Sequence, residues 1–355
     1  MIRCSKVRRW RCAVGDWRSD PTFAMCREVV DGADLALFAG GPFDVRAVVA
    51  GILPELRRYL PLDAVPWGNF PHGPKVREAV AALCADGEPG MDATGVLGGL
   101  CANDSRAAVA LAVPFLIPLA TDAHHPHRAA ALSGPARARY FGVASREELF
   151  LHRTDPARHA PDGYDDYGVE VTAYPAGWSV AAARIAITAN MPALLPLFDD
   201  PDPTIRVDAA YALATATDLD HIVRTALAGG FEAERDPMVR AAFTLATAEI
   251  TRAHPHPPTV AWLRERWHDD AEAPEVRLVA AIGWLCLTDD PAPEDLRRTV
   301  DALADDERAH GMDVLPWMSF AAGTNEPGLL RCKRCMLHPD PETIFWDSLF
   351  DQLKD

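Results

Sequence analysis

Apolar residues recur at helical spacing along much of the chain, and a clear early example lies between residues 44 and 60. The positions that share one helical face there are Val45, Val48, Val49, Ile52 and Leu56. Because an amphipathic helix buries one face against neighbouring elements, a run of such segments predicts a helical fold. The same spacing predicts helices at 75–85, 105–120 and 180–189, followed by pairs of helices to about residue 310.

Prolines and a serine refine the bounds of these helices. Pro114 and Pro118 lie inside the segment 105–120, and a proline within a helix removes a backbone donor and crowds the preceding turn. We therefore expect a kink or a restart there. Ser179 stands before the helix at 180–189 and is a candidate N-cap.

A spaced repeat dominates the second half of the chain. Its three copies, each containing proline, any residue, a β-branched residue and arginine, are 202–206, 236–240 and 273–277. The arginines, Arg206, Arg240 and Arg277, lie 34 and then 37 residues apart, and an Ala-rich apolar stretch follows each one. A period of this size is typical of a repeat array.

The turn chemistry explains how one unit folds. Pro203 and Pro237 end the first helix of their units, and Asp202 and Asp236 are placed to cap the second. One amphipathic helix cannot bury its face alone, but a pair buries half of it and the next pair covers the rest. The repeat therefore predicts an all-α chain in which helix pairs stack into an α/α superhelix.

The unit from Leu194 to Leu213 combines a Leu-rich helix, an Asp-Pro turn and an Ala-rich helix. It resembles the HEAT-repeat family, specifically over 190–290 and more weakly over 74–120. The segments 164–168 and 174–180 look like a larger set of uncharacterised bacterial HEAT-repeat proteins. The resemblance implies a HEAT-like solenoid that usually binds proteins. A minority of relatives are enzymes, including alkyl-base DNA glycosylases and bilin lyases, and some are assembly factors.

The pattern predicts three regions. Residues 1–60 form an N-terminal extension with capping helices, 61–310 form the repeat array, and 311–355 form a C-terminal cap. A long irregular loop at 152–178 interrupts the array, and loops of this length are usually functional or disordered. The Cys-, Arg- and Trp-rich start at 1–30 is either a loose terminus or a docking tail for a partner.

The central loop carries the first candidate site. Its acids and aromatics are Tyr164, Asp165, Asp166, Tyr167, Tyr174 and Trp178. Carboxylates beside aromatic rings can hold a cationic or peptide ligand. If the protein is an enzyme, Asp165, Asp166, Tyr164 and Tyr167 are the candidates for general acid–base work. The alternative is a loop that packs its aromatics on the helices and leaves its acids in water.

The repeat arginines and the turn acids each have two interpretations. Arg206, Arg240 and Arg277 are expected to form a structural ladder that pairs with turn acids and with carbonyls at helix C-termini. The alternative is a functional arginine stripe along a groove. Acids cluster at 199–202, 269–272, 289–295 and 305–307, where they either cap helices and aid solubility or steer a basic partner.

Two groups of residues are candidates for a metal site. Cys332, Cys335 and His338 supply three of the four ligands that a structural zinc needs, and Cys4 or Cys12 completes the set only if the termini meet. The alternative is a pair of unpaired thiols. The histidines near the centre match no metal motif and are interpreted as exposed loop residues: His124, His125, His127, His152 and His159. No other cofactor is predicted.

The composition limits the classes of function that the chain can have. Hydrophobic residues make up 49% of the 355 residues, enough for a sizeable core, and the formal charge of −16 disfavours nucleic acid as a partner. No apolar run is long enough to span a membrane. The scattered cysteines point to a reducing cytoplasm, with Cys84, Cys101 and Cys286 read as core residues. The common nucleotide, metalloprotease and hydrolase motifs are missing from the sequence.

Together these features favour a non-enzymatic scaffold that grips a protein or peptide, with a basic partner favoured, through its concave face or its central loop. The alternative is an enzyme on the same scaffold that acts on a small molecule, a peptide or a nucleobase. A DNA glycosylase is the named case. It requires an arginine-lined face with a pocket carboxylate and aromatics, and the net charge of −16 disfavours it.

Overall fold

The computed structural model describes residues 62–65, 67–69, 73–85, 106–129, 131–132, 150–151, 153, 178–216, 220–323 and 325–338. Every regular element within these ranges is helical, so the described part of the chain is all-α. The N-terminal segment 1–30 and the helix expected at 44–60 lie outside the described residues.

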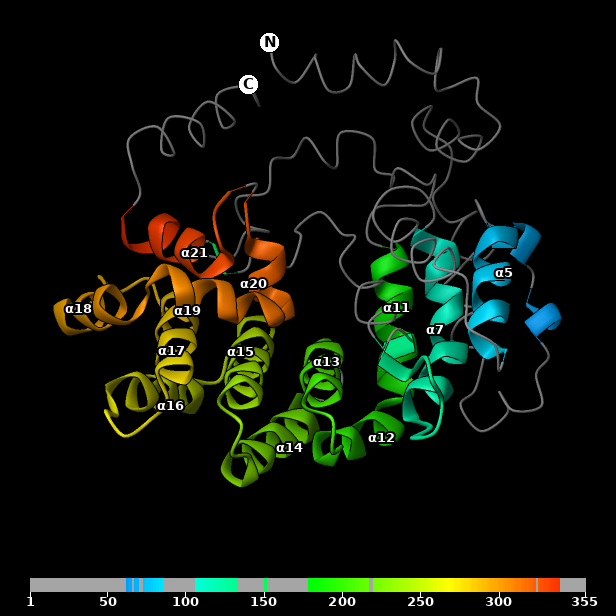
Figure 1. The fold of residues 1–355 in the computed structure, drawn as a ribbon, viewed down its shortest axis with the longest axis horizontal. Coiled ribbons are helices and arrows are strands. Elements are labelled where there is room, and N and C mark those ends of the chain that lie inside the picture. The colour runs from blue at the N-terminus through cyan, green and yellow to red at the C-terminus, as the bar shows by residue number, and fades with distance from the viewer. Residues whose placement is uncertain are drawn as a thin grey trace, which may run out of the picture.

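One set of helices lies side by side in a row that runs across the molecule (Figure 1). In chain order these are α5 (Gly73–Cys84), α7 (Arg106–Thr121), α11 (Trp178–Ala189), α13 (Pro203–Leu213), α15 (Pro237–Ala253) and α17 (Pro274–Leu287). Each contacts the next member of the row. Two short 3-10 helices, η4 (Leu62–Ala64) and η5 (Trp67–Asn69), precede α5.

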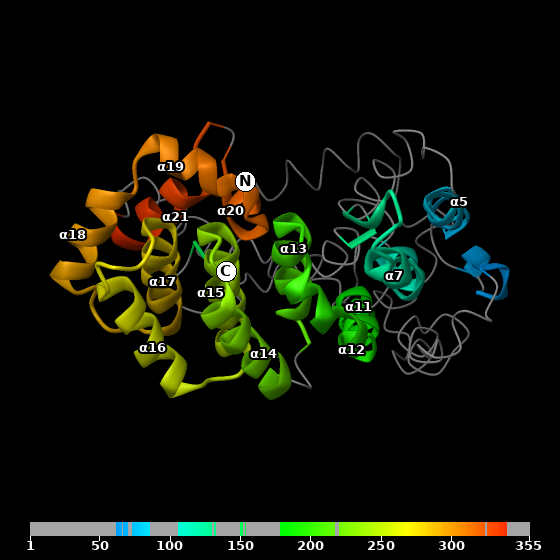
Figure 2. The ribbon, with the colours of Figure 1, turned by 60° about the horizontal axis from the view of Figure 1, so that its bottom comes forward.

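A second layer packs on one side of this row. It contains α12 (Met191–Leu194), η7 (Leu195–Asp199), α14 (Asp220–Ala233), α16 (Pro257–His268) and α18 (Glu294–Leu303). α14 packs on α15, and α16 and α18 pack on α17. From α11 to α18 the chain therefore passes back and forth between the two layers (Figures 1 and 2). The helix pairs predicted up to about residue 310 are therefore present, ending with α19 (Asp306–Gly311).

The helix starts follow the local signals in the turns. The side chain of Asp202 accepts a hydrogen bond from Thr204 N at 2.9 Å, and that of Asp236 accepts one from Met238 N at 2.8 Å. A proline occupies the first turn of α13 and of α15, where no intrahelical donor is required. Both predicted N-caps are confirmed.

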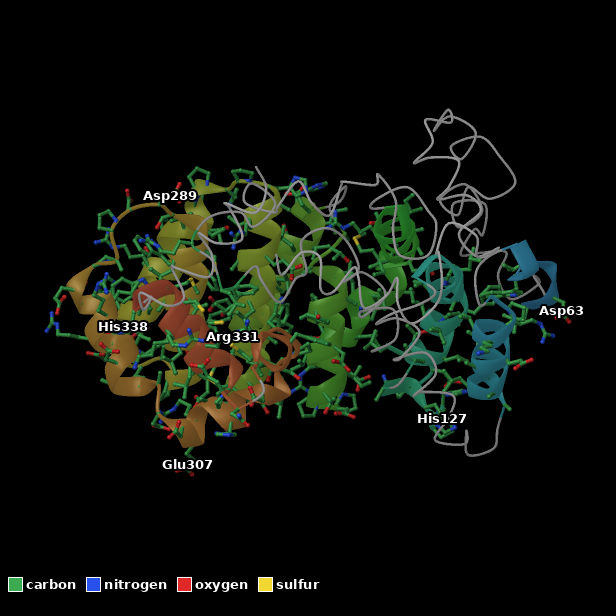
Figure 3. The ribbon with its side chains drawn as sticks, turned by 90° about the horizontal axis from the view of Figure 1, so that it is seen from above. Asp63, His127, Asp289, Glu307, Arg331 and His338 are labelled. Carbon is green, nitrogen blue, oxygen red and sulfur yellow. The ribbon has the colours of Figure 1, made fainter. Side chains whose placement is uncertain are left out.

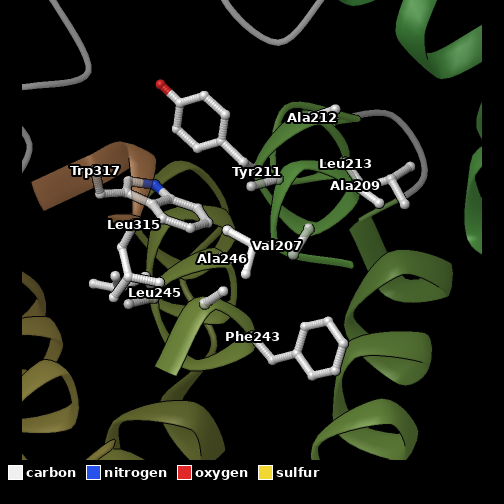
Figure 4. Close-up of a cluster of buried hydrophobic side chains, with 14 of the residues drawn as sticks. Val207, Ala209, Tyr211, Ala212, Leu213, Phe243, Leu245, Ala246, Leu315 and Trp317 are labelled. Atoms are coloured by element: carbon white, nitrogen blue, oxygen red, sulfur yellow. The ribbon is translucent and has the colours of Figure 1, made fainter. Parts of the chain in front are cut away.

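Small residues bring the central helices close together. A Cβ atom on Gly283 of α17 would lie 3.0 Å from the Cβ of Ala248 on α15. The Ala-rich stretches predicted after each repeat arginine are buried here, and their side chains belong to one continuous apolar cluster (Figure 4). Because alanine and glycine have little bulk, the helix axes can approach closely without leaving voids.

Two predicted helix bounds differ from the structure. α7 continues through Pro114 and Pro118 without a restart, and Thr121 Oγ1 donates to the carbonyls of Ile117 and Pro118 at its end. A proline fits the helical φ angle, so two lost donors are tolerated in this buried helix. α11 begins at Trp178, which places Ser179 inside the first turn instead of at the N-cap.

The C-terminal helices turn back over the central row. After η9 (Met312–Val314) come α20 (Pro316–Ala321) and α21 (Gly328–Leu337). α20 contacts α13, and α21 contacts α17, on the side opposite α14 and α16 (Figure 1). We call this side of α13, α15 and α17 the inner face. The region predicted as a C-terminal cap thus covers part of the inner face.

A short piece of the central region also reaches α17. Phe150 and Leu151 are buried in the apolar cluster. Arg153 Nη2 donates to the carbonyl of Thr288 at 3.1 Å, 135 residues away, and also to the carbonyl of Asp290. Since these carbonyls follow the last turn of α17, Arg153 serves as a partner for groups that the helix itself leaves unpaired. None of the described helices has the length and apolarity needed to cross a membrane.

Candidate functional site

The predicted loop site falls largely outside the described residues. Tyr164, Asp165, Asp166, Tyr167 and Tyr174 all lie there, and of Trp178 the structure describes the backbone as the first residue of α11. Their binding or catalytic role stays a prediction. The described residues contain two other arrangements with functional potential, one at the turns and one on the inner face.

Arg206 links its own turn to the next one. Its Nη1 donates to the carbonyl of Asp200 at 2.6 Å, within the same turn. Its Nε donates to Glu234 Oε2 at 2.7 Å, and Nη2 lies 3.4 Å from Oε1 of the same carboxylate. The two side chains are 14% and 12% exposed, so little solvent screens the pair.

Arg240 repeats this arrangement one unit later. Its Nη1 donates to the carbonyls of Phe231 at 2.8 Å and Glu234 at 3.3 Å, and its Nη2 donates to Glu272 Oε2 at 2.5 Å. The guanidinium carbon also lies 3.9 Å from the centre of the Phe231 ring, a cation–π contact. Glu234 is thus held twice, by Arg206 through its carboxylate and by Arg240 through its carbonyl.

The same link extends toward the N-terminal side. Arg128 binds the carboxylate of Asp200, the residue whose carbonyl Arg206 holds. Burial acts to raise the pKa of Asp200, but the hydrogen bonds from Arg128 and from the N–H of Asp202 outweigh it, and the pKa is lowered. One chain of contacts therefore joins the end of α7 to the start of α17.

Arg277 departs from the pattern. Its Nη2 pairs at 2.7 Å with Asp270 of its own turn, a side chain that is 90% exposed, and its Nε lies 3.3 Å from the carbonyl of Trp267. The acid that would receive it in the next turn, Asp305, instead caps α19 and pairs with Arg308. All three repeat arginines contact turn acids and helix-end carbonyls. Of the three, only Arg206 and Arg240 bind an acid in the following turn.

Six of the turn acids take part in such contacts. Asp200, Glu234 and Glu272 accept from arginines, while Asp202, Asp236 and Asp305 cap helices. An arginine offsets the charge of the first three, whereas a cap formed with backbone N–H groups leaves the carboxylate charge in place, so the expected attraction of a basic partner stays a prediction.

The inner face holds one buried carboxylate. Glu249 of α15 is 7% exposed and is the one acidic residue of the described ranges that is buried as a whole, although the side chains of Asp200 and Glu272 at the turns are also largely shielded. The indole Nε1 of Trp317, on α20, donates to Glu249 Oε2 at 2.7 Å across 68 residues of sequence. Because an ionised carboxylate is costly to bury, this hydrogen bond offsets part of its lost hydration.

Aromatic rings surround this contact. The Tyr211 ring of α13 meets the Trp317 ring edge-on, with centroids 4.7 Å apart and an angle of 88° between the planes. Phe320, on the next turn of α20, stacks nearly parallel to Tyr211 at 6.5 Å. Figure 4 shows Tyr211 and Trp317 facing each other between α13 and α20. A hydrogen-bond acceptor and three aromatic rings thus converge at one place.

Sequence reasoning overlooked Glu249, although a signal for it exists. When the repeats are aligned on their arginines, the ninth residue after each arginine is Thr215, Glu249 or Cys286. All three are buried; Glu249 and Cys286 lie within Ala-rich helices, and Thr215 lies just after the end of one. A single acid inside the Ala-rich stretch after Arg240 breaks the pattern of a core helix, and buried charged groups are found where they have a partner.

The inner face also carries buried thiols. Cys286 Sγ lies 4.0 Å from the sulfur of Met336 on α21, and Cys332 occupies the preceding turn of the same helix. Burial raises the pKa of Cys286 to about 11, which nearby Arg252 and Arg153 only partly oppose. Burial likewise raises the pKa of Cys332. These thiols are therefore poor nucleophiles near neutral pH.

Among the described candidates for the metal site, Cys332 and Cys335 lie three residues apart on α21, and His338 lies just beyond the end of this helix. His338 Nε2 lies 3.2 Å from Asp301, whose pKa is lowered first by the hydrogen bond from Lys333. Cys332 is fully buried, whereas His338 is exposed. Within the described ranges no group of three or more His, Cys, Asp or Glu could hold a metal ion. Cys4 and Cys12, the other ligands considered, lie outside those ranges.

The structure describes some of the other histidines and cysteines that the sequence analysis interpreted. His125 and His127 meet edge-on at 5.6 Å, far from His338 (Figure 3), while His152 and His159 lie outside the described residues. Cys286 is a core residue as expected. Cys84 is exposed at the end of α5, so its assignment to the core was wrong, and Cys101 lies outside the described residues.

The inner face offers binding chemistry in a compact form. It combines aromatic rings with a carboxylate acceptor, and the apolar group with a hydrogen-bond donor that they hold in this structure is Trp317 of α20. No family model, curated protein or solved structure matches the chain.

Proposed function

We propose that this chain is a cytoplasmic HEAT-like repeat protein that binds a protein or peptide partner and catalyses no reaction. In this proposal the row from α5 to α17 is a solenoid, and its inner face is the concave surface of a superhelix. The alternating layers and the contacts between successive turns support this architecture. Stacked helix pairs with nearest-neighbour contacts are the usual basis of extended binding surfaces.

The observation that carries the proposal is the way Tyr211 and Glu249 of the inner face hold Trp317 of α20. Aromatic residues that bury a large area, with one well-placed polar group, are the typical centre of a protein interface. The repeat arginines support a scaffold as well, because they hold turns together and are not directed to a ligand.

An enzyme on the same scaffold is the second candidate. The observation that favours it is Glu249, a carboxylate beside aromatic rings, which is a combination used in general acid–base catalysis of reactions on small molecules, peptides or nucleobases. The DNA glycosylase case also needs a continuous arginine-lined face. Arg206, Arg240 and Arg277 are engaged at the turns and do not supply one.

Affinity capture from native lysate tests the two candidates. The tagged full chain is compared with Glu249→Gln, which preserves shape and an acceptor oxygen while removing the charge. A stoichiometric protein partner that is retained by the wild type supports the binding proposal. A retained small molecule with no protein partner, lost in Glu249→Gln, supports the enzyme instead.

The central loop is tested separately. If the loop binds the partner, the double variant Asp166→Ala with Tyr167→Ala loses the captured partner while its far-ultraviolet circular dichroism stays unchanged. Undiminished capture by this folded variant assigns binding to the inner face and removes the loop from the proposal.

A further inference from the structure

α20 packs on the inner face as a ligand would. It has only six residues, and its apolar side chains Trp317, Met318 and Ala321 are almost completely buried, as is Leu315 just before it. Such a short helix is unstable alone in water and owes its form to what it packs against. Its docking, and not its own helical propensity, therefore holds this segment in place.

The surface that receives Trp317 comes from two helices of the row. Tyr211 of α13 packs edge-on against the indole, and Glu249 of α15 accepts its N–H at 2.7 Å. Leu245, one turn before Glu249, belongs to the same buried cluster (Figure 4). We call Tyr211, Leu245 and Glu249 the indole site. Its groups lie on separate repeats, so the site is a property of the stacked row.

The contact has the composition of an interface centre. A tryptophan fills the middle, a buried hydrogen bond from its indole N–H orients it, and Phe320 stacks at the edge where it is only partly buried. Tryptophan is enriched among the residues that dominate binding energies in protein complexes, and buried carboxylate acceptors give such contacts specificity.

We infer that the indole site is the recognition site for a partner segment, and that α20 occupies it as an internal competitor. This inference rests on the proposed binding function. The partner segment is a short helix with a tryptophan whose N–H reaches Glu249, because the chain's own α20 binds there through this chemistry. Partner binding then displaces α20 from the inner face, and the two occupants exclude each other.

A peptide titration tests the inference. The probe is a fluorescently labelled peptide of residues 312–323 of this chain, and binding to the full-length protein is followed by anisotropy. Trp317→Ala empties the site, so the peptide should bind this variant at least about tenfold more tightly than the wild type, a factor worth about 1.4 kcal/mol. The matched control, Val314→Ala, alters an exposed side chain in η9 and should bind as the wild type does.

The hydrogen bond is tested within the same titration. A peptide with phenylalanine in place of its tryptophan keeps a ring but lacks the N–H, and it should bind Trp317→Ala about tenfold more weakly. Adding Glu249→Leu to the protein should remove this discrimination. If Trp317→Ala loses its helical circular dichroism signal, Trp317→Phe replaces it, because this variant keeps most of the packing while weakening the internal competitor.

The outcomes separate this inference from the proposed function. If the peptide binds no folded variant more tightly than it binds the wild type, the competitor role is overturned. In lysate capture, Trp317→Phe should retain more of the partner than the wild type. Equal capture of one partner by both proteins contradicts the inference and leaves the binding function standing, whereas the absence of any partner counts against the function itself.

Discussion

The guanidinium of Arg206 binds the carboxylate of Glu234, 28 residues further along the chain, with 2.7 Å between Nε and Oε2. Arg206 follows the turn inside one helix pair, and Glu234 lies in the corresponding turn of the next pair. The contact therefore ties two units together at the point where their turns meet, and both side chains are largely shielded from water.

Replacing Arg206 by alanine should lower the free energy of unfolding by about 2–4 kcal/mol, because it leaves Glu234 shielded without its cation and frees the carbonyl of Asp200. Urea denaturation followed by circular dichroism measures this. Arg235→Ala is the matched control, since that side chain is exposed and the variant should change stability by less than about 0.5 kcal/mol. Equal losses in both variants would contradict the interpretation of Arg206 as an inter-unit link.

Glu249→Leu should destabilise the fold by about 1–3 kcal/mol, because the indole N–H of Trp317 then lies buried without an acceptor. Glu249→Gln retains a carbonyl oxygen at the same position and should cost clearly less. The ratio of the two losses in urea denaturation isolates the hydrogen bond from the packing. Identical losses for the two variants would show that the carboxylate contributes only through its charge or volume.

The buried thiol of Cys286 should make the free energy of unfolding decrease as the pH becomes alkaline. Its pKa is raised to about 11 in the folded protein by burial, so the unfolded chain releases this proton at lower pH than the folded one does. The protonated thiol makes its full contribution to the free energy of unfolding below about pH 9. This contribution, up to roughly 3 kcal/mol, is lost as the pH rises toward 11. Unfolding free energies at pH 8, 9 and 10 should fall less steeply for Cys286→Ala than for the wild type. Parallel slopes would remove this group from the alkaline response.

Gly328 marks a close approach between α20 and α21. A Cβ atom there would lie 1.8 Å from the carbonyl oxygen of Met318, so Gly328→Ala must push the two helices apart at a cost of about 1–3 kcal/mol. Gly311→Ala is the control, because nothing lies within 4 Å of its added methyl group. Thermal unfolding of the two variants compares them directly. An unchanged melting temperature for Gly328→Ala would mean that α20 is not held firmly against α21.

Local signals made the helices and turns predictable. Asp202 and Asp236 act on donors two or three residues away, and the adjoining prolines act on their own turns, so a short window of sequence contains the whole interaction. The burial of the Ala-rich stretches follows equally well, since their periodicity admits no exposed face.

The return of α20 to the inner face is not encoded locally. Trp317 and Glu249 are 68 residues apart, and neither side chain shows in its own segment that the other is its partner. What the sequence does show is an acid within an apolar stretch. That oddity identifies Glu249 as a residue in need of a partner but cannot say which one.

The metal hypothesis for Cys332, Cys335 and His338 illustrates the same limit. Their spacing suggests a shared ligand, but α21 carries Cys332 into the core while His338, beyond its end, pairs with Asp301. Cys332 and Cys335 are three residues apart and so share one side of the helix, but His338 lies beyond the helix end, where the linear spacing does not fix its direction. The zinc site stays a prediction.

Because Arg206 and Arg240 each bind the acid of the following turn, the turns from α13 to α17 have a direction, with guanidinium first and carboxylate second. The helix pair α14 and α15 brings one of each, Glu234 and Arg240, so adding or removing a pair of this kind intact leaves both contacts with a counterpart. A cut between α14 and α15 separates the two residues. In this part of the chain we therefore expect whole helix pairs to be the units that can be exchanged, which gives protein engineers a rule for shortening or lengthening it.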